Sequence, residues 1–199
     1  MTPTHADIAM TTLHRFDLDR LPAMPWKNGG GRTREIACWP PGAGLEDFGW
    51  RCSVASIESD GPFSAFAGVD RQILLLAGDG VHLQGEGLDH RLDVPLQPFA
   101  FAGEAAIHCS RLGGDSTDFN VMTRRGRFHA EVAVHAQSAH LAGSPHGLLL
   151  AVSGTWRTGA AAPLAPGQGL WWADAVGPAE AVPQDGGDAR LIVVRLLPA

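Results

Sequence analysis

The densest set of reactive side chains lies in a glycine-rich motif, Met24–Ile36, which reads MPWKNGGGRTREI. Three consecutive glycines let the backbone take positive φ angles and let a ligand or another strand approach closely. A P-loop does not fit, because it has lysine after its glycines and leads into a helix, whereas Lys27 precedes them and a strand is expected to follow. The alternative is a structural loop that leads into that strand.

Polar side chains recur on one face of three expected strands. Alternation places Arg51 and Ser53 on one face of the segment Trp50–Ile57. Two further pairs share a face in the same way, Thr33 with Glu35 and Asn120 with Met122. If these faces line the interior of a barrel, they form a small polar pocket. The predicted ligand-binding residues are Thr33, Glu35, Arg51, Ser53, Asn120 and Met122, with Lys27 and Asn28 at the glycine-rich rim.

The chemistry of this predicted pocket suits a carboxylate. The guanidinium of Arg51 can bind a carboxylate through two parallel hydrogen bonds, while Ser53, Thr33 and Asn120 would orient the ligand. Glu35 would accept a hydrogen bond from the ligand or hold Arg51 in place. The alternative is an internal Arg51–Glu35 ion pair with no ligand at all.

Metal and nucleophilic chemistry have little support. The nine histidines include no HxH or HxxxH pair, and the three cysteines, Cys38, Cys52 and Cys109, have no CxxC spacing. We expect reduced, buried thiols, no metal and no cofactor. No GxSxG nucleophile motif is present, and the absence of tyrosine excludes any mechanism that needs a phenol.

Charge and hydropathy limit the partners. Fifteen basic against twenty-one acidic residues give a formal charge of -6, which argues against nucleic acid. The N-terminus lacks the features of a signal peptide, and no apolar run approaches the roughly 20 residues of a membrane span. We therefore expect a cytoplasmic protein with a loose stretch of about ten residues at its start, and we leave a homodimer open.

The elements that must position these side chains are short strands, because 25 glycines and 14 prolines leave little room for long helices. Apolar or alternating runs between turn signals indicate an all-β sandwich or barrel. The expected strands are Thr33–Cys38, Trp50–Ile57, Gln72–Ala77, Gly80–Leu83, Phe99–Phe101, Ala106–Leu112, Phe119–Met122, Phe128–Val134, Leu148–Val152 and Leu191–Leu197.

An internal sequence repeat indicates two related modules. Leu74–Gly80 reads LLLAGDG and Leu148–Gly154 reads LLLAVSG, and each is followed by a proline and an aromatic strand. We expect a single domain over residues 1–199, with two modules at about 13–127 and 128–199 packed as one body.

Five motifs in order make this chain resemble the HutD/Ves family. They are PWKNGGG with TREI, RCSVA, GPFS, GVDR and DFNVMTRRG, spread between Leu13 and Phe128. The resemblance implies a cupin-like, RmlC-like jelly-roll β-barrel of the two-module bicupin kind. It also implies a regulatory role in histidine utilisation, with formylglutamate as the suggested ligand, while the Ves branch is associated with stress responses.

The chain departs from metal-binding cupins, since only His82 stands where an HxH motif is expected. The leading hypothesis is a metal-free cupin that binds a small carboxylate and regulates histidine utilisation. A metal-independent isomerase or hydrolase with Glu35 as general base is the enzymatic alternative. A structural or stress-related protein without a ligand is the third.

Overall fold

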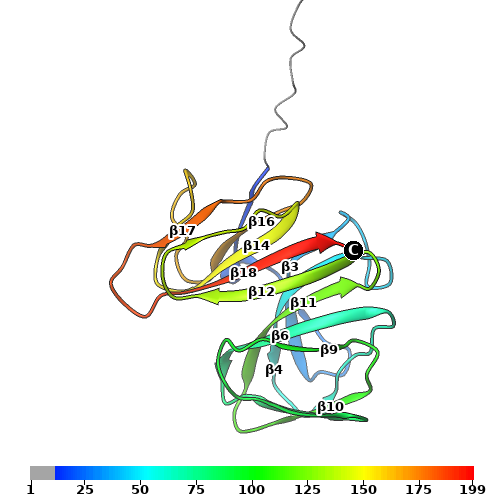
Figure 1. The fold of residues 1–199 in the computed structure, drawn as a ribbon. Coiled ribbons are helices and arrows are strands. Elements are labelled where there is room, and N and C mark those ends of the chain that lie inside the picture. The colour runs from blue at the N-terminus through cyan, green and yellow to red at the C-terminus, as the bar shows by residue number, and fades with distance from the viewer. Residues whose placement is uncertain (1–11) are drawn as a thin grey trace, which may run out of the picture.

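The computed structural model describes residues 12–199, so the expected loose start of the chain lies outside the described part. These residues form eighteen strands and one short 3₁₀ helix, η1 (Leu18–Arg20), arranged in four sheets (Figure 1). We number the sheets I to IV.

Sheets I and II come from the first part of the chain. Sheet I has the order β2-β3-β4-β11-β6-β9, with β2 (Ala23–Pro25), β3 (Gly31–Trp39), β4 (Trp50–Ile57), β11 (Ser116–Arg124), β6 (Val69–Gly78) and β9 (Phe99–Ala102). Sheet II has the order β5-β10-β7-β8, with β5 (Gly61–Pro62), β10 (Ile107–Arg111), β7 (Val81–Gly85) and β8 (Leu88–Leu92).

Sheets III and IV come mainly from the last third. Sheet III has the order β1-β16-β14-β18-β12, with β1 (His14–Asp17), β16 (Gln168–Trp172), β14 (His146–Ser153), β18 (Arg190–Pro198) and β12 (Phe128–His135). Sheet IV has the order β13-β17-β15, with β13 (Ala139–His140), β17 (Glu180–Pro183) and β15 (Trp156–Arg157). Strand β1 therefore joins the sheet of the second module, although it precedes the first module in the chain.

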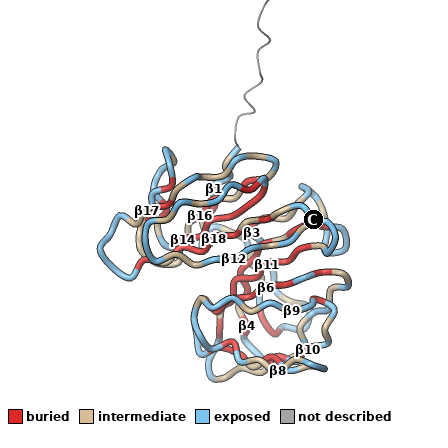
Figure 2. The backbone as a smooth tube through the Cα atoms, viewed as in Figure 1, coloured by how far each residue is buried: buried red, intermediate tan, exposed pale blue. Residues whose placement is uncertain are grey.

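Sheets II, I and III follow one another from the bottom to the top of Figure 1, and β17 of sheet IV lies at the upper left beside sheet III. Side chains along the strands of sheets I and III point alternately to the two faces of their sheet. Both faces contact another sheet, and the buried residues are concentrated in these strands (Figure 2). On β4, for example, Trp50, Cys52 and Val54 enter the core between sheets I and III. Ile57 enters the core between sheets I and II. A third large core lies between sheets III and IV and includes Trp156 and Leu170.

The predicted all-β class is confirmed. Each of the ten expected strands overlaps a strand of the structure, and Trp50–Ile57 coincides with β4. The short strands β5, β13 and β15 were not predicted because each spans only two residues, too few for alternation to show.

The two copies of the internal sequence repeat occupy corresponding positions in the structure. Leu74 on β6 and Leu148 on β14 both enter the core between sheets I and III, while the next residues, Leu75 and Leu149, enter the core of their own module. The aromatic strands also correspond, since β9 pairs with β6 as β16 pairs with β14. The repeated LLL therefore reflects strands buried on both faces.

Among the described residues, no helix is long and apolar enough to cross a membrane.

Candidate functional site

A row of polar side chains lies on the face of sheet I that points toward sheet II. Strand β11 is the middle strand, and its residue Met122 pairs in register with Arg51 of β4 on one side and with Arg71 of β6 on the other. One step along the same face, Asn120 pairs with Ser53 and Ile73. Four of the predicted ligand-binding residues, Arg51, Ser53, Asn120 and Met122, therefore lie together as expected.

Arg51 is held by its neighbours. Its Nε donates to Glu35 Oε2 at 2.6 Å, and its Nη1 lies 3.4 Å from Ser53 Oγ and 4.0 Å from Met122 Sδ. The Arg51 side chain is 12% exposed and that of Glu35 is 49% exposed. A register shift in the β3–β4 pairing, between Glu35 and Ala37, lies beside this ion pair, as β-bulges often do at functional sites. The ion pair that we raised as an alternative to a ligand is thus present, with its acidic partner open to solvent.

Arg71 is the second arginine of the row and was not among the predicted site residues. Its guanidinium carbon lies 5.3, 5.8 and 5.0 Å from the ring centroids of Phe63, Phe66 and Phe101, and the residue is 6% exposed. Its Nη1 donates a long hydrogen bond, 3.4 Å, to the carbonyl of Ser64, and its buried Nε has no partner. Burial lowers the pKa of Arg71 to about 10, opposed by the charge of Asp118. Arg71 therefore stays protonated at neutral pH inside an aromatic enclosure.

Asp118 supplies a buried carboxylate on the same face of β11. It is 2% exposed, and burial raises its pKa to about 6, opposed by the charge of Arg71 and by backbone N–H groups. Its Oδ1 has no hydrogen-bond partner, and neither does Oδ1 of Asn120. Two buried hydrogen-bond acceptors at successive inward-facing positions of β11 thus lack donors. This costs free energy unless another group donates hydrogen bonds to them.

Loops cover the end of sheet I next to Arg51 and Arg71, the two residues that we call the arginine row. Phe48, Val69 and Met122 form a small apolar cluster with Phe66 packed against it. Arg124 holds the loops, because its guanidinium donates to the carbonyls of Ala67 at 2.9 Å and Glu46 at 2.7 Å. The neighbouring Arg125 is paired with Asp70 and Glu104. Neither arginine of this pair is free to bind an anion.

The glycine motif lies at the other end of the sheet. Gly31 pairs with Ile57, whereas Cys38 pairs with Arg51, so the turn holding Lys27 and Asn28 is separated from Arg51 by six residues of β4, about 20 Å. Both residues are exposed, and Asn28 Oδ1 accepts a hydrogen bond from Gly30 N at 3.0 Å. The structure does not bring Lys27 and Asn28 to the arginine row, and their place at a ligand rim stays a prediction.

The glycines of this motif allow a turn and the close approach of β3 to β4. Gly29 has a φ of +71°, and a Cβ on Gly31 would lie 2.0 Å from the carbonyl oxygen of Ser56 on β4. Of our two expectations, the close approach of another strand is the one seen. Thr33, also predicted as a site residue, accepts a hydrogen bond from Trp26 Nε1 at 2.7 Å, which uses one acceptor position of its hydroxyl.

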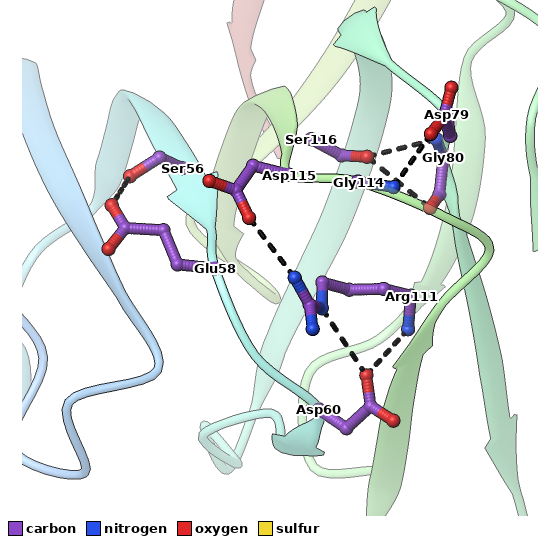
Figure 3. A network of polar contacts seen from close by, with 9 residues as sticks. All are labelled: Ser56, Glu58, Asp60, Asp79, Gly80, Arg111, Gly114, Asp115 and Ser116. Atoms are coloured by element: carbon purple, nitrogen blue, oxygen red, sulfur yellow. Dashed lines mark hydrogen bonds and ion pairs between the residues drawn. The ribbon is translucent and has the colours of Figure 1, made fainter.

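A polar network ties the loops at this same end (Figure 3). Asp79 Oδ2 accepts from Gly114 N at 2.6 Å, and Arg111 donates its backbone N–H to Asp60 and its Nη1 to Asp115. The acidic groups are satisfied by the chain itself. No group of three or more metal-ligating side chains occurs among residues 12–199.

A cavity of about 360 Å³ lies at the junction of sheets I and III, and Arg71 is among its lining residues. Its lining includes Gln72 and Val121 of sheet I and His129 and Ala130 of β12 in sheet III. Gln72 Nε2 donates to the carbonyl of Ala130 at 2.7 Å across this junction. The residues of the predicted pocket do not line this cavity.

The inward orientation of Arg71 and Asp118 could have been predicted from the sequence. Arg71 lies two residues before Ile73 in β6, and Asp118 two residues before Asn120 in β11, so alternation from a known inward position would have found both. We had placed the two residues in resemblance motifs without assigning them to a face.

Fold and site together define a cupin-like, all-β protein with a polar face between sheets I and II. A cupin 2 conserved barrel domain protein from Leptotrichia buccalis shares the fold, with a TM-score of 0.55 and 11% identity, over 92% of this chain and 96% of that chain.

The chain belongs to the HutD family, whose model matches residues 18–188. It is similar to Protein Ves of Citrobacter koseri, 42% identical over 161 residues, which cover 80% of this chain and 82% of that protein. A Pseudomonas putida protein described as an uncharacterized 21.2 kDa protein in the hutC 3' region is 42% identical over 141 residues, 71% of this chain and 74% of that one. The structure of HutD from Pseudomonas fluorescens SBW25 in a formate condition has a TM-score of 0.82 and 31% identity, over 94% of this chain and 100% of that chain.

Proposed function

We propose that this protein binds a small carboxylate metabolite between sheets I and II, and that binding serves a regulatory role in histidine utilisation in the cytoplasm. The observation that carries the proposal is Arg71, a buried guanidinium with an unpartnered Nε, beside Arg51 on the same face. Isolated buried charges are costly, so they are normally paired. A carboxylate from a ligand would supply the missing partner.

The link to histidine utilisation rests on relatives. The chain shares its family with HutD of P. fluorescens, and one similar protein is described by its position beside hutC. A formylglutamate-like compound, which carries two carboxylates, suits two arginines separated by one strand. Its similarity to Ves proteins leaves a stress-related role as the alternative. We also propose that each pair of sheets is a cupin module, which makes the chain a bicupin.

Calorimetric titration tests the proposal with formate, glutarate and N-formylglutamate as probes. We expect N-formylglutamate to bind and to raise the melting temperature. The Arg51→Ala and Arg71→Met variants should each weaken binding by tenfold or more, because a hydrogen bond to a charged group contributes about 1.5–3 kcal/mol.

The matched control is Arg91→Ala, since Arg91 is an exposed arginine that also forms an ion pair, with Asp93. Its affinity should equal that of the wild type. If no small carboxylate binds the wild type, or if both site variants bind like the control, the proposal is wrong.

An isomerase or hydrolase that uses Glu35 as general base is less well supported, because Glu35 Oε2 is bonded to Arg51 at 2.6 Å. Turnover of a bound probe by the wild type but not by Glu35→Gln would restore the enzymatic alternative.

A further inference from the structure

Two loops from different parts of the chain meet over the arginine row. We call them the β3–β4 loop (residues 40–49) and the β5–β6 loop (residues 63–68). Phe48 of the first loop is fully buried in a small apolar cluster that also contains Met122, the residue between the two arginines. Phe66 of the second loop packs against the same cluster. Side chains of both loops therefore cover the arginine row.

The β5–β6 loop also encloses Arg71. Phe63 and Phe66 supply two of the three rings around its guanidinium, with centroids 5.3 and 5.8 Å from the central carbon. The carbonyl of Ser64 accepts a hydrogen bond from its Nη1 at 3.4 Å. With these groups in place, Arg71 is only 6% exposed. A ligand reaches this guanidinium from the loop side only when the loop moves away.

Arg124, the last residue of β11, joins the two loops. Its Nη2 donates to the carbonyl of Glu46 at 2.7 Å, and its Nη1 donates to the carbonyl of Ala67 at 2.9 Å. Its guanidinium carbon also lies 5.2 Å from the ring centroid of Phe48. In the described part of the chain, no hydrogen bond runs directly from one loop to the other. The Arg124 guanidinium is therefore the polar link between them.

A guanidinium suits this link. Its N–H groups form a rigid, planar fork that can donate to two carbonyls at once, whereas a lysine ammonium is a compact charge on a flexible stem. Hydrogen bonds from a charged donor are also stronger than those between neutral groups. Separating the loops from Arg124 thus costs free energy, but it breaks no backbone pairing of sheet I.

We propose that the two loops form a lid over the arginine row and that Arg124 is the latch that holds this lid closed. A ligand enters or leaves when the Arg124 guanidinium releases the loop carbonyls and the rings of Phe63 and Phe66 move away from Arg71. Arg124 is thus a positioning residue, because it acts on the loops. The inference rests on the proposed function for its ligand, but the lid itself can be tested without one.

Hydrogen exchange followed by NMR tests the latch on the full chain without ligand. The reporters are the N–H groups of Phe66, bonded to the Gly103 carbonyl at 2.7 Å, and of Gly49, bonded to the Trp39 carbonyl at 2.6 Å. In Arg124→Met both should exchange at least tenfold faster, since exchange follows the opening equilibrium and the lost hydrogen bonds have a charged donor. Arg124→Lys should give rates between those of the wild type and Arg124→Met.

The matched control is Arg125→Met, because Arg125 is the adjacent arginine and its side chain is bonded to Asp70 and Glu104 instead of to the loop carbonyls. The two reporters should exchange in this variant as in the wild type. Low concentrations of urea should not accelerate them, because local opening exposes little surface. Unchanged reporters in Arg124→Met, an equal effect of Arg125→Met, or reporters that open only by global unfolding would each overturn the proposal.

Stopped-flow kinetics with N-formylglutamate as the probe test the role of the lid in ligand exchange. We expect the lid to be closed both with and without ligand. Arg124→Met should therefore raise the association and dissociation rate constants together, by about tenfold, and change the Kd by about threefold or less. Loss of a group that binds the ligand, as in Arg51→Ala, should instead weaken the Kd.

The two experiments separate this inference from the proposed function. If the probe binds and Arg124→Met leaves both rate constants unchanged, the ligand enters past Glu35, whose side chain is 49% exposed, and the lid has no role in exchange. If N-formylglutamate does not bind, the proposed ligand class fails, and hydrogen exchange still decides whether Arg124 holds a lid closed.

Discussion

Arginine is the cation that this chain places against aromatic rings. Arg71 lies over Phe63, Phe66 and Phe101, and Arg124 lies 5.2 Å from the ring centroid of Phe48. A planar guanidinium stacks on rings and keeps its charge when buried, whereas a buried lysine readily loses its proton. The lone lysine, Lys27, is exposed in a turn. Fourteen of the fifteen basic residues are arginines, and contacts of this kind in the interior and at the loops explain part of that preference.

His146 is a buried titratable residue of a different kind, at the junction of the modules. Its ring centroid lies 5.5 Å from that of Trp39 and 5.1 Å from that of Phe128, and its Nδ1 has no partner. Burial lowers its pKa, while the nearby carboxylate of Asp174, 3.3 Å from Nε2, raises it. The net effect is a pKa below the ordinary value of about 6.5.

We predict that His146 makes the fold less stable in mild acid. Below about pH 6.5 the unfolded chain binds a proton at this residue more readily than the folded chain, so the free energy of unfolding falls as pH falls. Asp118 has the opposite sign, because burial raises its pKa. The measurement is therefore a difference: urea unfolding from pH 7.5 to 5.0 for the wild type and for His146→Leu.

The stability gap between these two proteins should shift in favour of the variant as pH falls. His140→Leu, at an exposed position, is the matched control and should show no such trend. A gap that stays constant across the range would contradict the prediction.

At the scale of elements, the pairing of β3 with β4 fixes the side of the site formed by Glu35 and Arg51. This pairing begins at Gly31, where the strands are so close that a Cβ would lie 2.0 Å from the Ser56 carbonyl oxygen and 3.2 Å from Trp26 Cε3. The obstructing atom is backbone, which cannot rotate away as a side chain can.

We predict that Gly31→Ala lowers the free energy of unfolding by about 2 kcal/mol or more, since overpacking typically costs about 1–3 kcal/mol. Gly29→Ala should cost about 1–2 kcal/mol through its positive φ alone. Gly143→Ala is the control, because nothing lies within 4 Å of its Cβ position and its φ is not positive. Urea unfolding measures all three, and equal stabilities for Gly31→Ala and Gly143→Ala would refute the close approach.

At the scale of the whole molecule, sheets I and III share one apolar core. Trp50, Val54 and Phe119 enter it from sheet I, and Leu148 and Val194 enter it from sheet III. Because each module needs the other to cover its large sheet, unfolding one exposes the core face of its partner. We therefore expect the two modules to unfold together.

The prediction is that Leu148→Ala, at a fully buried position, destabilises the protein by about 2–5 kcal/mol. It should also keep a single transition with the same midpoint by circular dichroism and by tryptophan fluorescence. The control is Leu45→Ala, because Leu45 is 50% exposed. Two separate transitions in the wild type would show that the modules are independent.

Much of the fold and part of the site could be predicted from local pattern. The alternation in Trp50–Ile57 placed Arg51 and Ser53 on one face, and the structure keeps them there because a strand has a side-chain period of two. The motif at Gly29–Gly31 indicated that another part of the chain or a ligand approaches closely, but it did not identify that group. A glycine shows only that a side chain is not tolerated at its position.

What the sequence determined by itself was the all-β class, the family, the repeated LLLA segment and the faces of individual strands, since each depends on residues close together in the chain. Only the tertiary structure decided that β11 lies between β4 and β6. That order places Arg51 and Arg71 on either side of Met122, adds Asp118 to the interior and leaves Lys27 at the far end of the sheet. Strand order arises from contacts between distant segments, and alternation within one strand holds no information about its neighbours.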